Sequence, residues 1–174
     1  MDLTLRSPRT ADAAALAAIT ADGFDSYVSF APPGWVPPPD TRAMFERDLL
    51  RQMGAASSWG MLAEVDGEIA GHAAFVPASA SGVPVDDPQL AHLWQLFVAP
   101  PYWGGGVATT LHDAAVRAAA GRGFTHMRLF TPADHGRARR FYEREGWTFA
   151  NRGRDSPLGL AVVEYRRQVS VSGS

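Results

Sequence analysis

The chain has 174 residues, of which 46% are hydrophobic and 20% are charged, and its formal net charge at pH 7 is −2. This length suits one domain with a substantial core, and the small negative charge excludes a general basic field for nucleic acid. The chain contains no cysteine, which excludes disulfides, thiolate nucleophiles and cysteine-ligated metal sites.

The N-terminal residues carry an early acid and lack a basic region followed by an apolar stretch, so we expect no signal peptide. The most apolar stretches contain Asp or Glu within about a dozen residues, well short of the ~20 that a bilayer span requires. We therefore expect a cytoplasmic protein without a membrane or nucleic-acid partner.

The hydrophobic pattern predicts strands and helices along the chain. In chain order we expect a strand at 3–6, helices at 11–23 and from 40 to about 53, strands at 59–65, 68–76 and 92–98, a helix at 107–120, a strand at 127–130, a helix at 134–145, and strands at 147–150 and 160–166. Thr10 and Asp40 can cap the first two helices, and Asp66-Gly67 fits a hairpin turn. We expect a domain over 1–167 and a disordered polar tail over 168–174.

This order of elements predicts a single α/β domain with helices on both faces of one mixed, mostly antiparallel sheet of six to seven strands. A parallel strand–helix–strand unit is expected near the centre of the sheet. The predicted core residues are Leu93, Leu96, Val98, Leu111, Val116, Leu129, Phe141 and Phe149.

Three consecutive glycines, residues 104–106, stand between a predicted strand and a predicted helix. Glycine permits close backbone approach and positive φ, and the free amides and dipole of a helix start favour a phosphate group. A tight turn without a ligand would also use glycines. A P-loop does not fit, because Val107-Ala108 follow instead of Lys-Ser/Thr, and Thr109 stands near the place of the third glycine of a dinucleotide fingerprint.

The wider segment 96–111, L-F-V-A-P-P-Y-W-G-G-G-V-A-T-T-L, resembles the acyl-CoA signature of the GNAT superfamily of N-acetyltransferases. That signature is a strand ending in V-x-P, then Q/R-x-x-G-x-G/A, then an amphipathic helix. Gly106 and Ala108 match its small positions, whereas Trp103 replaces the usual Gln or Arg. The segment 134–147 is similar to the family's N-x-x-A-x-x-F/L-Y-x-x-x-G-F pattern, with His135 in the Asn position.

The resemblance implies the GNAT fold, with acetyl-CoA as co-substrate and no metal. It implies direct attack on the thioester by a primary amine of a small molecule, a peptide or a protein, and a possible homodimer. The implied CoA-binding residues are Phe97, Val98, Trp103, Gly104, Gly105, Gly106, Val107, Ala108, Thr109, His135 and Tyr142. The alternative is a non-catalytic acyl-CoA-binding regulatory or partner-binding module, which the substitutions at Trp103 and His135 leave open.

Tyr142 is the implied general acid for the leaving thiolate, because a phenol with an ordinary pKa of ~10 is protonated at neutral pH. The alternative is a tyrosine packed at a helix–sheet junction with its hydroxyl satisfied there. The resemblance also implies that a backbone amide near Phe97 or Val98 stabilises the oxyanion.

His92 is the first candidate for a general base. A strand period of two would place it on one face with Trp94 and Leu96. His72, on a neighbouring strand, is either structural or lines the acceptor cleft, and Glu64 is a further candidate. Two alternatives without a catalytic histidine stay open. His92 is a hydrogen-bonded structural residue, or the amine arrives deprotonated and needs no protein base.

The segment 24–39 contains Tyr27, Phe30 and Trp35 together with five prolines. In the family this region overhangs the acceptor site, which implies an aromatic-lined acceptor pocket. These aromatic residues would equally well complete the core.

Two further sets of residues lie on predicted helices. His112, on the helix after the glycines, is expected at the surface. Four arginines form a basic face that is either solvated or reaches the 3′-phosphate of CoA: Arg137, Arg139, Arg140 and Arg144.

Overall fold

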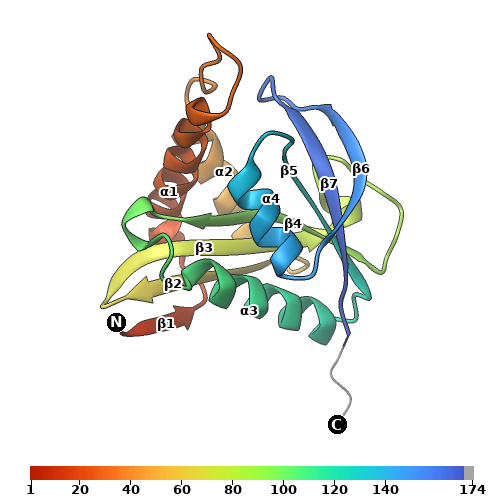
Figure 1. Ribbon diagram of the computed structural model, residues 1–174. Helices are drawn as coiled ribbons and strands as arrows, with labels where there is room; N and C mark the ends of the chain where they lie inside the picture. Colours follow the sequence, from red (N-terminus) through yellow and green to blue (C-terminus); the bar gives the residue numbers. More distant parts are fainter. Residues whose placement is uncertain (171–174) are drawn as a thin grey trace.

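The computed structural model describes residues 1–170, which form a seven-stranded sheet with helices on both faces (Figure 1). The strands are β1 Leu3–Arg6, β2 Trp59–Val65, β3 Glu68–Pro77, β4 Leu90–Val98, β5 His126–Pro132, β6 Thr148–Asp155 and β7 Ala161–Gln168. The helices are α1 Ala13–Asp25, α2 Thr41–Met53, α3 Val107–Gly121 and α4 Gly136–Arg144, with short 3₁₀ turns η1 Thr10–Asp12, η2 Ser26–Ser29, η3 Ala78–Ala80 and η4 Pro100–Tyr102. The predicted fold class is confirmed. Within these residues, no helix combines the length and apolarity needed to cross a bilayer.

The strand order is β1-β2-β3-β4-β5-β7-β6, and within the described chain β4–β5 is the parallel pair. The predicted hairpin joins β2 and β3, with positive φ at Asp66 (52°) and Gly67 (86°). Two consecutive positive φ angles match the right-handed strand twist, which is why an Asp-Gly pair suits this turn.

The parallel pair β4–β5 separates part of the way along its length. Leu90–His92 pair with His126–Arg128, although β4 continues to Val98 and β5 to Pro132. Beyond the paired positions, no strand within residues 1–170 lies beside this edge of β4. The sheet is therefore split at its centre, next to the turn that leads into α3 (Figure 1).

A β-bulge in β4 decides which of its side chains share a face. The pairing with β3 shifts between Leu93 and Gln95, so Trp94 is an extra residue. Leu96 packs with the core cluster under α3, whereas Trp94 packs with the cluster under α1 and α2. The predicted common face of His92, Trp94 and Leu96 is therefore wrong, because the bulge reverses the alternation.

Most of the predicted core lies between the sheet and α3. Leu93, Leu111 and Leu129 are at most 4% exposed, and Leu96, Val98, Val116 and Phe141 are partly buried. Phe149 was predicted to be buried but is 42% exposed. It stands on the edge strand β6, where its ring packs edge-on against Tyr165 and has the guanidinium of Arg139 above it at 5.8 Å.

The two predicted helix caps are not present as expected. Asp40 precedes α2 with a φ of 59° and makes no side-chain capping hydrogen bond. Thr10 lies inside η1, and α1 begins only at Ala13. Asp12 precedes α1 without a side-chain capping hydrogen bond, and its carboxylate instead accepts from the amide of Arg9, at the start of η1, at 2.7 Å.

The predicted tail over 168–174 begins inside the fold. Strand β7 includes Gln168, and Val169 is 5% exposed, with its amide donating to the carbonyl of Thr125 at 2.9 Å. Residues 171–174, the rest of that prediction, lie outside the described residues.

Candidate active site

A cleft of about 1300 Å³ opens where β4 and β5 separate. Its walls come from the end of α1 with η2, from β4, the glycine turn, β5, α4 and the β6–β7 turn. Twelve residues that the sequence pointed to line it: Tyr27, Phe30, Phe97, Val98, Trp103, Gly104, Gly106, Val107, Ala108, Thr109, His135 and Tyr142. The fold thus brings the separate sequence motifs together around one cavity.

The glycine turn ends at the N-terminus of α3, on the cleft wall. Gly104 and Gly106 have φ angles of 77° and 83°, in the left-handed region where other L residues are strained. The first amides of a helix have no intrahelical acceptor, so the 15-residue α3 presents free N–H groups and its positive dipole end at the cleft. This geometry suits a phosphate group.

Trp103, which replaces the usual Gln or Arg, holds an arginine in place. Its indole N–H donates to the carbonyl of Val98 at 2.7 Å, and the guanidinium of Arg137 lies 4.0 Å above its ring. Arg140 and Arg144 also line the cleft, whereas Arg139 is not part of a solvated face. It donates to the hydroxyl of Tyr165 and to a backbone carbonyl.

The position of Arg137 predicts a contribution to CoA affinity. Arg137→Ala should raise the Kd for CoA about fivefold at low salt, as expected for ~1 kcal/mol from a partly exposed ion pair, and the difference should shrink as salt is added. Arg117→Ala, on the exposed side of α3, is the matched control. Equal affinities of the Arg137→Ala variant and the unmodified protein at low salt would show that Arg137 does not contact the nucleotide.

Tyr142 lines the cleft from α4, with its ring packed against Trp147 and Tyr165 at centroid distances of 5.9 and 6.4 Å. Burial, and then the neighbouring Tyr27, raise the pKa of Tyr142 above its ordinary value. The phenol is therefore protonated throughout the neutral range and can act as a proton donor.

His135 takes the place of the family's Asn at the cleft. Its ring stacks on Phe30 at 4.7 Å and meets Tyr27 edge-on at 5.2 Å. Burial, followed by the charge of Arg137, lowers the pKa of His135 to about 4. At neutral pH the imidazole is uncharged, with one donor and one acceptor, which is also what an amide side chain offers.

The proposed bases do not line the cleft. His92 is 8% exposed, and its Nδ1 accepts from Nε of Arg128 at 3.2 Å. His72 lies 2.9 Å from the hydroxyl of Thr20 and lines a separate cavity of about 240 Å³ under α2. Glu64 accepts from Arg6 on the far strands of the sheet. The structural interpretation fits His92 and His72, and Glu64, the further candidate, takes part in an ion pair away from the cleft.

The two buried histidines predict a strong acid sensitivity of the fold. Burial lowers the pKa of His72 from 6.5 to about 4 and that of His92 from 6.5 to about 3. As the pH falls below the pKa that these histidines have in the unfolded chain, the unfolded chain binds protons while the same histidines in the native state stay uncharged. The free energy of unfolding should therefore fall with pH, by ~3 kcal/mol per pH unit between about pH 6 and pH 4 from these two groups, and His135, whose pKa is also lowered to about 4, adds to the slope.

Urea unfolding at a series of pH values measures this slope. His72→Gln can keep a hydrogen bond to Thr20 but does not titrate, and it should remove the share of one group, ~1.4 kcal/mol per pH unit. Equal stability at pH 7 and pH 4 would contradict the prediction.

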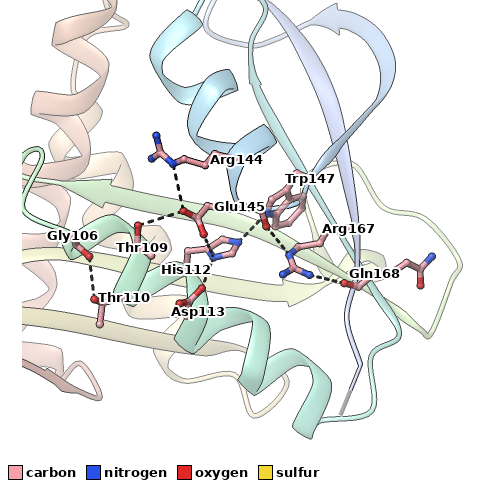
Figure 2. A network of polar contacts seen from close by, with 10 residues as sticks. All are labelled: Gly106, Thr109, Thr110, His112, Asp113, Arg144, Glu145, Trp147, Arg167 and Gln168. Carbon is pink, nitrogen blue, oxygen red and sulfur yellow. Dashed lines mark hydrogen bonds and ion pairs between the residues drawn. The ribbon is translucent and has the colours of Figure 1, made fainter. Parts of the chain in front are cut away.

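His112 was predicted at the surface but is 1% exposed, because Phe141 of α4 and Trp147 cover its face of α3 (Figure 2). The indole of Trp147, which can only donate, bonds His112 Nε2 at 2.9 Å. The imidazole proton is therefore on Nδ1, which lies 3.0 Å from Asp113 and 3.8 Å from Glu145. The Thr109 hydroxyl donates to Glu145 at 3.4 Å, so the network joins the start of α3 to the end of α4.

The same three groups, His112, Asp113 and Glu145, lie close enough to be considered as metal ligands. A cation at Nδ1 would need the imidazole proton on Nε2, where the Trp147 N–H already donates. The hydrogen-bond pattern therefore favours a structural network over a metal site. The Thr109 hydroxyl donates to Glu145 in this network, so its proton is not available to a phosphate.

Several cleft residues were missed by the sequence interpretation. Aromatic and apolar side chains of Phe24, Met44, Phe45, Trp94, Phe130, Pro157 and Leu158 also line the cleft. Trp35, in contrast, is not a lining residue, and its indole N–H donates to the carbonyl of Leu158 at 2.8 Å. The β6–β7 turn carries no motif, so its place at the cleft could come only from the fold.

The Acetyltransferase (GNAT) family matches residues 22–147 of the chain. That range covers more than half of the 174 residues, and the chain belongs to this family of acetyl-CoA-dependent N-acyltransferases. No curated protein is significantly similar to the chain.

Solved structures of acetyltransferases share the fold. A ribosomal-protein-alanine N-acetyltransferase from Brucella melitensis has a TM-score of 0.72 and 19% identity, covering 95% of this chain and 99% of its own. The PaiA N-acetyltransferase from Thermoplasma acidophilum, in complex with coenzyme A, has a TM-score of 0.67 and 16% identity, covering 94% and 98%. A Salmonella typhimurium protein solved with its cofactor acetyl-CoA has a TM-score of 0.72 and 18% identity, covering 100% and 98%.

Proposed function

We propose that the chain transfers an acetyl group from acetyl-CoA to a primary amine by direct attack, with Tyr142 as the general acid. One observation carries the proposal. Where β4 and β5 separate, the free edge of β4 faces a cleft that also holds the N-terminus of α3 and Tyr142. A diphosphate site, a row of backbone polar groups and a protonated phenol therefore surround the same space.

Each group has a distinct task in this scheme. The amides of Gly104 and of residues 106–108 bind the pyrophosphate, whereas the Gly105 amide already donates to the carbonyl of Tyr102 at 3.3 Å. A backbone amide near Phe97 or Val98 donates to the oxyanion. The amine nitrogen forms a bond to the acyl carbon, and the carbon–sulfur bond breaks. Tyr142 gives its proton to the departing sulfur, and the amine loses its extra proton to water.

No candidate base from the sequence lines the cleft, so the amine must reach the thioester uncharged. The chain has no cysteine, which closes a thiol-based double displacement. Both points favour direct attack within a ternary complex.

Initial rates of thiol release, with acetyl-CoA and an amine varied together, test the scheme. Direct attack predicts intersecting double-reciprocal lines and no acetylated protein by mass spectrometry when acetyl-CoA is present alone. Parallel lines with an acetyl-enzyme would refute it, and CoA binding without turnover on a broad amine panel would favour the non-catalytic alternative. A homodimer is still a prediction from the resemblance alone.

A further inference from the structure

We propose that the acceptor is a small amine with an apolar, uncharged body, and not a polyamine or a protein segment. The inference rests on the proposed function, because it concerns the amine that the same site would acetylate.

The part of the cleft away from the glycine turn is lined mainly by apolar side chains, beside Ser26, Ser29 and Ser156 and the exposed side chains of Arg154 and Asp155. We call it the acceptor chamber and define it by Phe30, Met44, Phe45, Phe130, Pro157 and Leu158. Phe24 lies parallel to Phe45 at 5.1 Å and packs against Phe97 of β4 at 5.5 Å, so this wall is supported from behind. Such a surface gains free energy from an apolar body and offers few partners to a polar one.

The charges around the cleft are unsuited to a polycation. Among the described lining residues, the carboxylates are Asp134 and Asp155, both exposed. Four lining arginines, Arg137, Arg140, Arg144 and Arg154, outnumber them. A second or third ammonium group would find no buried carboxylate among the described lining residues, so it would lose hydration with little gain from an ion pair.

Two contacts of the segment 24–39 close the chamber on its outer side. The Trp35 indole N–H donates to the carbonyl of Leu158 at 2.8 Å, and the Phe30 ring stacks on His135 at 4.7 Å. In Figure 1 this segment and the β6–β7 turn both lie at the upper end of the molecule. An extended polypeptide needs an open groove along which its backbone can lie, and here the two walls touch.

An apolar chamber also explains how the amine could lose its proton without a protein base. Enclosure by apolar groups disfavours an ammonium ion and lowers the pKa of the bound amine. An amine with an apolar body can fill the chamber and lose its proton on entry, whereas a polyamine retains charges that must stay hydrated.

Three acceptors with acetyl-CoA at saturation distinguish the substrate classes: 2-phenylethylamine, spermidine and a short peptide with a free N-terminus. The kcat/KM for 2-phenylethylamine should exceed each of the others by about tenfold or more. Faster turnover of spermidine or the peptide would overturn the acceptor class and leave the proposed function standing. Absence of turnover with all amines, while CoA binds, would overturn both.

Variants of the chamber test its role. Leu158→Glu keeps the backbone carbonyl that accepts from Trp35 but adds a carboxylate, and it should lower kcat/KM for 2-phenylethylamine and raise it for spermidine. Leu158→Met is the matched control with an apolar side chain. Trp35→Phe removes the N–H that joins the walls, and it should raise the relative rate with the peptide without changing the Kd for CoA. Unchanged selectivity in both Leu158→Glu and Trp35→Phe would contradict the proposal.

Discussion

Replacement of Tyr142 by Phe is expected to lower kcat by about 10²–10⁴-fold and to leave the KM for acetyl-CoA nearly unchanged. The ring contacts with Trp147 and Tyr165 persist in this variant, so binding should be kept. The hydroxyl that is lost stabilises the sulfur only as it develops charge in the transition state. Removing a group that acts only in the transition state lowers kcat and leaves KM nearly unchanged.

A thioester whose leaving thiol is more acidic should reduce the defect, since its thiolate needs less help from a proton donor. Tyr165→Phe is the matched control, because that hydroxyl bonds Glu143 and Arg139 outside the cleft. It should affect stability without producing the same kcat defect. If Tyr142→Phe retains full kcat, solvent delivers the proton and Tyr142 is a packing residue.

Replacement of Gly106 by Glu is expected to weaken CoA binding by at least about 100-fold. The residue caps α3 with a φ of 83°, and the space beside its α-carbon is open, so the effect does not depend on a steric clash within the protein. Two causes act together: an L residue is strained by ~1–2 kcal/mol in this conformation, and a carboxylate repels the pyrophosphate at the dipole end of the helix.

Gly106→Ala separates the two causes, because it introduces the strain without the charge and should weaken binding much less. Gly106→Pro would be a poorer test, since the fixed φ of proline near −65° cannot match the observed turn. Calorimetry with CoA, beside thermal unfolding of each variant, makes the measurement. If Gly106→Glu folds and binds CoA with unchanged affinity, the pyrophosphate site lies elsewhere.

The sequence by itself determined the elements whose signals are local. The Asp66-Gly67 turn, the glycines before α3 and the apolar run of β4 each depend on neighbouring residues in the chain, and each lies where it was predicted. The order of these elements then restricts the sheet to few topologies. The two motif segments also predicted that the glycine turn and Tyr142 would meet, and both line one cleft.

Only the tertiary structure decided how individual side chains are used. The bulge at Trp94 depends on pairing with β3, and one extra residue there reversed the faces assigned to β4. His112 became buried because α4 and Trp147 cover that face of α3, and His92 is held by Arg128 instead of facing the cleft. The contact between Trp35 and Leu158 joins residues 123 positions apart. Such long-range contacts follow from packing of whole elements, which no local pattern records. For this reason the part of the cleft at the glycine turn and Tyr142 was predictable, whereas the part formed by the β6–β7 turn was not.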